Sequence, residues 1–302
     1  MANAKQILTR HIREIMIRKL FAFFAFLSVV LLGLIVLFLF REGLPLFKEI
    51  SVSQFIFGSA WYPTYDPPEY GIWPLIVGSL IVTFFACLIA VPFGILSAVY
   101  ISEIAPARIR EILKSVIELL AGLPSVVLGF FGMVILAPWL QETFDLPTGL
   151  NIVNASLMLA VMAIPTISSI SEDALYAVPR EFKEASYALG ATKYETIVKV
   201  AIPAAFSGIS TAVILGMSRA IGETMVVLMV AGGAAAIPRG IFDSVRPMTA
   251  SIAAEMGEAP FQSGHYHALF ATGIVLFFIT LAFNLIADHI STKYKEEGSG
   301  TL

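Results

Sequence analysis

The segment Pro179–Pro203, PREFKEASYALGATKYETIVKVAIP, is a polar stretch between two strongly apolar ones. Pro179 suits the first turn of a helix, because its missing N–H needs no partner there. Gly190 stands where that helix should end, since glycine adopts the left-handed conformation without strain. Thr192 and Glu195 have the spacing of a capping box and predict a second helix. Two short helices hinged at Gly190 are therefore expected.

Each of these predicted helices has one apolar face. The first face consists of Phe182, Ala185, Ala188 and Leu189, and the second of Ile197, Val198 and Val200. Pro203 then predicts entry into the next membrane segment. Such helices suit insertion into a groove of a partner protein. A loop that merely lies on lipid is the alternative.

The composition is that of a polytopic membrane protein. Of the 302 residues, 58% are hydrophobic and only 14% are charged, and the mean hydropathy is +0.85. Soluble domains carry about 25% charged residues. The net charge of −3 gives no indication of a nucleic-acid partner. The single Cys87 excludes an internal disulfide and a cysteine-rich metal site.

Long apolar runs predict an all-α integral membrane protein with six transmembrane helices, since about 20 residues cross a bilayer. The runs are Leu20–Phe40, Ile72 to about Tyr100, Leu119–Leu140, Ile152 to about Ile170, Ala204 to about Gly232, and His267 to about Ile286. Residues 1–71 would hold a cytoplasmic segment, the first helix and an extracytoplasmic loop. Residues 72–288 would form a five-helix core with a cytoplasmic loop at 176–203, followed by a cytoplasmic tail at 289–302.

Basic residues predict the orientation in the membrane. With the N-terminus inside, the inner segments hold fourteen Lys and Arg residues and the outer segments four, with Arg219 left within the membrane. Both termini and the Pro179–Pro203 loop are therefore expected in the cytoplasm, on a multi-pass protein of the cell inner membrane. Aromatic anchors are expected at the outer interface, namely Trp61, Tyr62, Trp73 and Trp139.

Two charged residues fall inside the fifth predicted span. Arg219 and Glu223 are four residues apart, so they lie one helical turn apart and can pair. Charged groups at this depth normally face a bundle interior or a water-filled path. An arginine can also donate two hydrogen bonds to an oxyanion. We take Arg219, Glu223, Ser218 and Thr224 as the candidate substrate path; an ion pair that only holds helices together is the alternative.

The polar loop resembles a known sequence pattern. Glu184-Ala185-Ser186, Gly190, Val200 and Ile202-Pro203 match the EAA loop of ABC-importer permeases, with serine, valine and isoleucine replacing the alanine, isoleucine and leucine of the pattern. The resemblance implies the type I ABC importer permease fold and a loop that seats in an ATP-hydrolysing subunit. The contact residues it implies are Glu184, Ala185, Ser186, Gly190 and Pro203.

Three further stretches resemble the C-type permease of phosphate ABC importers. They are residues 218–225, 120–132 and 247–258. The resemblance implies an A-type permease as a heterodimer partner, a pair of cytoplasmic ATP-binding subunits and an extracytoplasmic phosphate-binding protein, with lipid around the complex. Importers of molybdate, tungstate or sulfate share the loop, so another oxyanion is an alternative substrate.

Other classes of function lack their signatures. The sequence holds no G-x-x-x-x-G-K-[ST] loop, so ATP hydrolysis is assigned to another chain. An intramembrane serine protease needs a serine and a histidine together at membrane depth, whereas His11, His265, His267 and His289 lie at or beyond span ends. No cofactor or metal is expected, although a metal at His265 and His267 is an alternative to an interfacial role. A sensor or scaffold without transport also stays open.

Overall fold

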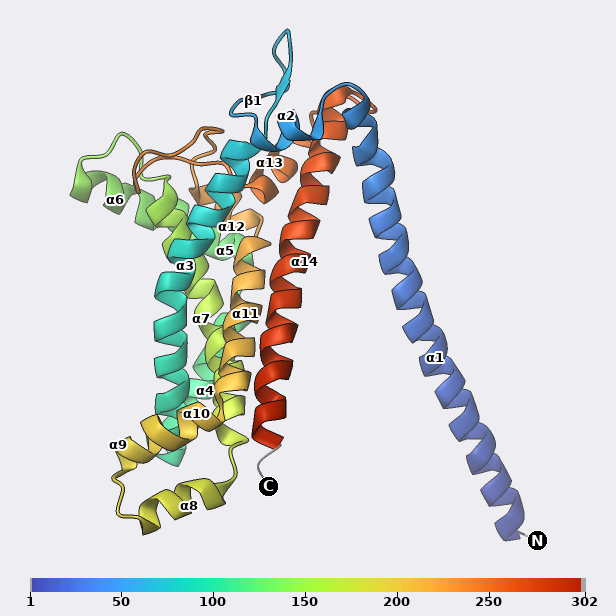
Figure 1. Cartoon of the computed structure of the whole chain (residues 1–302), viewed down its shortest axis with the longest axis vertical. Coiled ribbons are helices and arrows are strands. Elements are labelled where there is room, and N and C mark those ends of the chain that lie inside the picture. Colours follow the sequence, from blue (N-terminus) through green and yellow to red (C-terminus); the bar gives the residue numbers. More distant parts are fainter. Residues whose placement is uncertain (1, 300–302) are drawn as a thin grey trace.

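The computed structural model describes the backbone of residues 2–299 and the side chains of residues 14, 16–286, 288 and 289. Figure 1 shows four long helices packed side by side, with α1 (Ala2–Gly43) set apart from them at an angle. The four are α3 (Trp73–Val99), α7 (Ile152–Tyr176), α11 (Phe206–Ile221) and α14 (Gly264–Ser299).

Shorter elements follow α3 and α7 along the chain. Beyond α3 the chain forms a π-helical turn (Tyr100–Ile104), α4 (Ala107–Ala121), α5 (Ser125–Phe131), a second π-helical turn (Gly132–Leu136) and α6 (Ala137–Phe144). Beyond α7 come α8 (Arg180–Ala188), α9 (Lys193–Thr196), a third π-helical turn (Ile197–Ala201) and α10 (Ile202–Ala204). We call the end that carries α8 the loop end (Figure 1).

The opposite end carries a small antiparallel hairpin, and we call it the hairpin end (Figure 1). After α1, a 3₁₀ turn (Leu44–Lys48) and α2 (Val52–Phe57) lead to β1 (Trp61–Tyr62) and β2 (Glu69–Tyr70). Trp61 pairs with Tyr70, and Tyr62 with Glu69. Two short helices, α12 (Met225–Val230) and α13 (Met248–Glu255), lie beneath this cap.

The predicted number of spans agrees with the structure. In the described part of the chain, five helices are long and apolar enough to cross a membrane. A sixth span is obtained if α11 and the segment Lys193–Ala204 before it, which meet at a bend of 70°, are counted as one span. The predicted irregular stretch between the first two spans holds only short elements.

Small residues let the central helices approach closely. The side chain of Ile167 on α7 inserts between Gly94 of α3 and Gly216 of α11. A methyl group added at Gly94 or Gly216 would lie 2.7 or 2.5 Å from that isoleucine. Close approach through small residues is a common means of helix association in membranes. These contacts fix the position of α11, which carries the candidate path residues.

The third span begins later than the sequence analysis predicted. Residues between the second and third predicted spans form the separate helix α4, which extends to Ala121, and the span itself begins at Ser125. Pro124 accounts for the break, because proline disfavours helical geometry at the residue before it. The apolar residues from Leu119 to Leu123 therefore belong to the end of α4 and its turn.

Within its described residues, α1 contacts the bundle near the hairpin end. From Met16 to Phe40 no described residue is buried. Contact with α14 is made by Gly43, whose added methyl would meet Ile274 at 2.6 Å, and by the Glu42 carbonyl, which lies 2.6 Å from His267 Nδ1. The first predicted span thus exists as a helix, and it runs beyond both predicted limits.

The hairpin end has its own hydrophobic cluster. Its largest buried side chains are Trp61, Phe55, Leu46, Ile72, Met248 and Leu269. The prediction of Trp61 as an interfacial anchor was wrong: it is 2% exposed. Its indole N–H donates to both carboxylate oxygens of Glu255, at 3.1 and 3.0 Å. Packing in this cluster and hydrogen bonding to α13 therefore account for the position of this tryptophan.

Candidate functional site

The fifth predicted span is broken where its charged residues lie. α11 ends at Ile221, and α12 begins at Met225. Gly222 closes α11, with its N–H donating to the Ser218 carbonyl at 3.3 Å. Because the helix stops between them, Arg219 and Glu223 do not share one helical face. The predicted pairing was wrong: among the described residues, no hydrogen bond or ion pair joins these two side chains, and each has another partner.

The side chain of Arg219, on α11, is hydrogen-bonded to α7 and is exposed in the isolated chain. One terminal nitrogen of its guanidinium donates to Thr166 Oγ1 at 3.0 Å. Thr166 is the fifteenth residue of α7, so it lies roughly 21 Å along a helix of about 37 Å. An arginine at that depth costs about 2.5–3.5 kcal/mol on insertion scales when it faces lipid. A second protein surface or a water-filled path must therefore cover it.

Glu223 serves a structural role in the break. Its carboxylate Oε1 accepts hydrogen bonds from the N–H groups of Met225 and Val226, at 3.1 and 3.4 Å. Its carbonyl accepts a hydrogen bond of 2.7 Å from Thr249 Oγ1 on α13. Both interactions stabilise the start of α12. A cavity of about 10 Å³ beside Glu223 holds one water molecule at most, so the described residues alone enclose no space there for an oxyanion.

The other two candidate path residues flank the same break. Ser218 donates to Asn284 Oδ1 on α14 at 3.1 Å. Thr224 donates to the Gly222 carbonyl at 3.4 Å. The four candidate path residues thus lie around the end of α11, but each of their side chains forms a hydrogen bond with a different partner. Thr166 and Asn284, which sequence reasoning did not select, complete this polar surface.

The predicted loop is built at the loop end of the bundle. α8 has no buried residue, and Leu189 and Phe182 on its apolar side are 90% and 50% exposed. Gly190 has φ +85°, as its predicted role at the helix end requires. The capping box of Thr192 and Glu195 is complete in both directions. These local predictions are confirmed, although Pro179 caps α8 rather than occupying its first turn.

The EAA residues lie mostly on the outer surface of this loop. Glu184 and Ala185 are exposed. Ser186 shares a hydrogen bond of 2.9 Å with Thr196, which is 1% exposed. Pro203 lies in α10, directly before the 70° bend into α11. The loop therefore offers apolar and acidic side chains outward while its base is fixed to the bundle.

Comparison with known proteins assigns the chain. The model of the family described as binding-protein-dependent transport system inner membrane component matches residues 90–296. The chain belongs to this family. A probable ABC transporter permease, YqgH of Bacillus subtilis, is 41% identical over 86% of this chain and 85% of its own length. A phosphate transport system permease, PstC of Pasteurella multocida, is 34% identical over 90% of each chain.

A solved relative has the same fold. A chain of a bacterial alginate ABC transporter, solved with its alginate-bound periplasmic protein, aligns with a TM-score of 0.59 at 17% identity. The alignment covers 88% of this chain and 94% of that one. The predicted type I importer permease fold is confirmed. As a member of a family of transport components, the chain is a permease and not an enzyme.

In this transport-family permease, sequence reasoning missed a polar cluster at the hairpin end. Glu255 accepts hydrogen bonds from Trp61 and from Arg246, and His265 Nε2 lies 2.8 Å from its second oxygen. A cavity of about 450 Å³ opens beside them. Two charged residues in an apolar region, Arg246 and Glu255, could have indicated this cluster in the sequence. Their pairing, however, depends on the fold.

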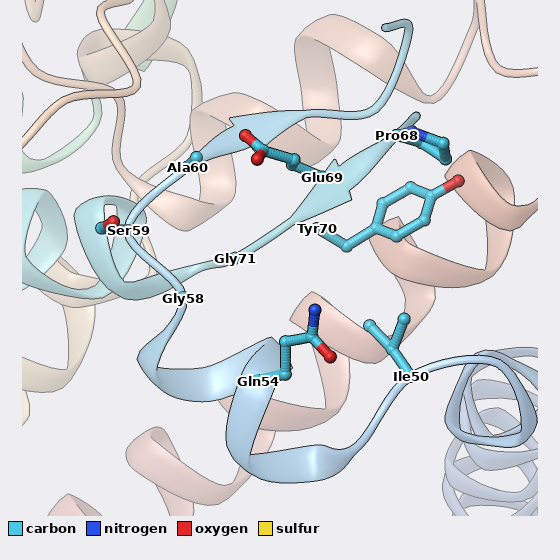
Figure 2. Close-up of a pocket in the computed structure, with 9 residues that line it drawn as sticks. All are labelled: Ile50, Gln54, Gly58, Ser59, Ala60, Pro68, Glu69, Tyr70 and Gly71. Atoms are coloured by element: carbon cyan, nitrogen blue, oxygen red, sulfur yellow. The ribbon is translucent and has the colours of Figure 1, made fainter. Parts of the chain in front are cut away.

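A second cavity of this permease lies between α2 and the hairpin (Figure 2). It measures about 170 Å³ and is lined by Gln54, Glu69 and Tyr70 among others. Burial, and then the nearby Glu49 carboxylate, raise the pKa of the Tyr70 phenol above its ordinary value. The cavity contains no candidate path residue, and we assign it no role.

Two histidines of this permease make contacts within the chain near the hairpin end. His265 contacts Glu255, and His267 contacts the Glu42 carbonyl. Among the residues whose side chains the structure describes, no group of three or more potential ligands is placed to hold a metal. The side chain of His11 lies outside the described residues.

Proposed function

We propose that this chain is the permease subunit of an ATP-driven importer that carries inorganic phosphate across the inner membrane. The likeness to a phosphate permease over nine-tenths of both chains supports the substrate. The observation that carries the proposal is Arg219, a fixed guanidinium in the middle of a span that is exposed on the isolated chain. Its remaining donors suit a phosphate oxyanion.

The exposed side of Arg219 calls for a second permease. An A-type permease would cover this surface and complete the path, with Ser218, Glu223 and Thr224 along its edge. Because a buried arginine is costly in lipid, a protein or water interface at this position is favoured over a lipid-facing one. Lipid covers the remaining apolar faces.

The exposed α8 is the proposed contact for a pair of ATP-binding subunits. Leu189 and Phe182 would enter a groove of the ATPase, with Glu184, Ala185, Ser186 and Gly190 at the contact and Pro203 at its base. Basic residues favour a cytoplasmic location for the loop end and for both termini. An extracytoplasmic phosphate-binding protein would then meet the hairpin end.

The proposed divisions of the chain are residues 1–71, 72–288 and 289–302.

The test is labelled phosphate uptake, driven by ATP, in vesicles that hold the complete complex. We expect Arg219→Gln to leave assembly intact and to lower uptake roughly 10- to 100-fold, because a hydrogen bond to a charged group contributes about 1.5–3 kcal/mol. Arg239→Gln is the control, since Arg239 lies in the loop at the hairpin end.

Three results would contradict parts of this proposal. Undiminished uptake by Arg219→Gln would remove the arginine from the path. Competition by molybdate or sulfate as strong as that by unlabelled phosphate would favour another oxyanion. Absence of nucleotide-driven uptake in the parent complex would favour a sensor or scaffold.

A further inference from the structure

α8 is attached to a spanning helix by an ion pair. Lys183 Nζ lies 2.6 Å from Glu103 Oε1, and the two side chains are only 19% and 10% exposed. No residue of α8 is buried. Among the described residues, the Lys183–Glu103 pair is therefore the polar contact that joins α8 to the end of α3. An ion pair so withdrawn from water holds its geometry more firmly than an exposed one.

Glu103 belongs to a rigid junction at the loop end. It lies in the π-helical turn that ends α3, and its carboxylate also accepts a hydrogen bond from Ser102 at 3.3 Å. Arg110 of α4 donates to the Ile101 carbonyl at 2.8 Å and to the Ser102 carbonyl. The segment that carries the Glu103 carboxylate, the partner of Lys183, is thus hydrogen-bonded to α4 as well as continuous with α3. A shift of α8 would therefore pull on a group that is fixed to both helices.

α3 links this junction to the opposite end of the bundle. Near its start, Ser79 Oγ accepts a hydrogen bond of 2.9 Å from the Met248 N–H of α13. The next residue, Thr249, donates to the Glu223 carbonyl at 2.7 Å. A continuous series of contacts therefore runs from α8 through α3 and α13 to the break beside Arg219. The 27 residues of α3 span about 40 Å along this route.

A second contact makes the two halves of the loop move together. Ser186 of α8 shares a hydrogen bond of 2.9 Å with Thr196, which lies 1% exposed at the end of α9. Ser186 is the position at which the chain departs from the alanine of the EAA pattern. Displacement of α8 is therefore shared with α9, while Lys183 directs it to α3.

We propose that the Lys183–Glu103 ion pair transmits displacement of α8 to α3, and through α3 to α13 and the backbone of Glu223. Lys183 and Glu103 are then positioning residues of the transport cycle. The inference rests on the proposed function, because the bound ATPase supplies the displacement. A pair that only keeps the loop folded would affect assembly instead.

The experiment uses the complete complex in vesicles and measures three quantities: retention of the ATPase, ATP hydrolysis, and phosphate uptake. The variants are Lys183→Met, Glu103→Gln, the double variant, and the conservative Lys183→Arg. We expect each neutralising single variant to retain the ATPase and to hydrolyse ATP, while uptake falls about tenfold, within the range of typical coupling effects. More ATP is then consumed per phosphate carried.

The double variant and the conservative variant separate transmission from folding. If the two residues act through each other, the double variant is no worse than either single one, and Lys183→Arg restores uptake to within about threefold of the parent. Lys199→Met is the matched control, because Lys199 forms an exposed pair with Glu195 in the same loop. Its uptake should stay within about twofold of the parent.

Each contrary outcome has its own meaning. Parent-like uptake by both single variants overturns the proposal, as does additive loss in the double variant. Release of the ATPase by the single variants also overturns it and assigns the pair to docking. Failure of the parent complex to take up phosphate with ATP overturns the proposed function, and this inference with it.

Discussion

The two ends of the bundle are built in opposite ways. At the hairpin end, large side chains such as Trp61 and Leu269 are fully buried, and Glu255 accepts hydrogen bonds from the nearby Arg246 and from Trp61, 194 residues away in sequence. At the loop end, α8 buries nothing and is tied down by single polar contacts. The hairpin is therefore held by packing, whereas α8 is held by polar contacts and leaves its apolar side exposed, as the proposed ATPase contact requires.

The largest effect is expected at the hairpin end. Trp61→Ala removes a buried ring and leaves Glu255 without its indole donor, so we expect a loss of about 3–5 kcal/mol of stability. Thermal unfolding of the purified permease in detergent measures it. Trp139→Ala is the control, because Trp139 is 54% exposed. Equal effects of the two substitutions would contradict the contrast between the ends.

An intermediate effect is expected at the loop end. Gly190 has φ +85°, and nothing lies within 4 Å of an added methyl group. Gly190→Ala should therefore cost about 1–2 kcal/mol in backbone strain alone and weaken the α8–α9 turn without unfolding the bundle. Hydrogen exchange of residues 180–196, together with ATPase retention, checks this. Gly257→Ala adds a methyl in open space without a positive φ and serves as control.

The smallest effect concerns a turn near the hairpin end. The N–H groups of Arg239 and Gly240 donate to the Asp243 carboxylate and lower its pKa from the ordinary 3.8. Because the pKa is lowered, these hydrogen bonds stabilise the folded turn fully at pH values above the ordinary pKa of Asp243. That stabilisation is lost as the pH falls through the lower pKa of Asp243 in the folded protein. We expect faster proteolysis around residues 238–245 only at such acid pH, with an acid-stable protease. In Asp243→Asn this pH dependence should disappear; its persistence would assign it to another group.

Features set by neighbouring residues could be predicted from the sequence. The left-handed Gly190 and the capping box of Thr192 and Glu195 were predicted correctly, since each depends on residues within one helical turn. The number of spans also followed, because span length is fixed by bilayer thickness. The start of the third span was misplaced, although Pro124 carried the necessary signal.

Features set by distant residues could not be predicted. Gly222, Glu223 and Thr224 interrupt the fifth predicted span only briefly, and apolar residues resume at Met225. Hydropathy averaged over the span therefore does not reveal the break between α11 and α12. That break depends on Glu223 turning back to cap α12 and on Thr249, which is 26 residues away. Burial of Trp61 likewise depends on Glu255, 194 residues away. Pattern reading thus located the candidate residues but not their partners.

The attachment of α1 near Gly43 has a consequence for its tilt. Phe38, Leu39 and Phe40 contact α14, whereas no described residue from Met16 to Leu37 is buried in the chain. The free energy that holds this part of α1 in place therefore comes from the surroundings. Bilayer thickness and neighbouring subunits, rather than intramolecular packing, set the angle of such a helix. The same chain can therefore carry α1 at different inclinations in membranes of different thickness while its bundle stays unchanged.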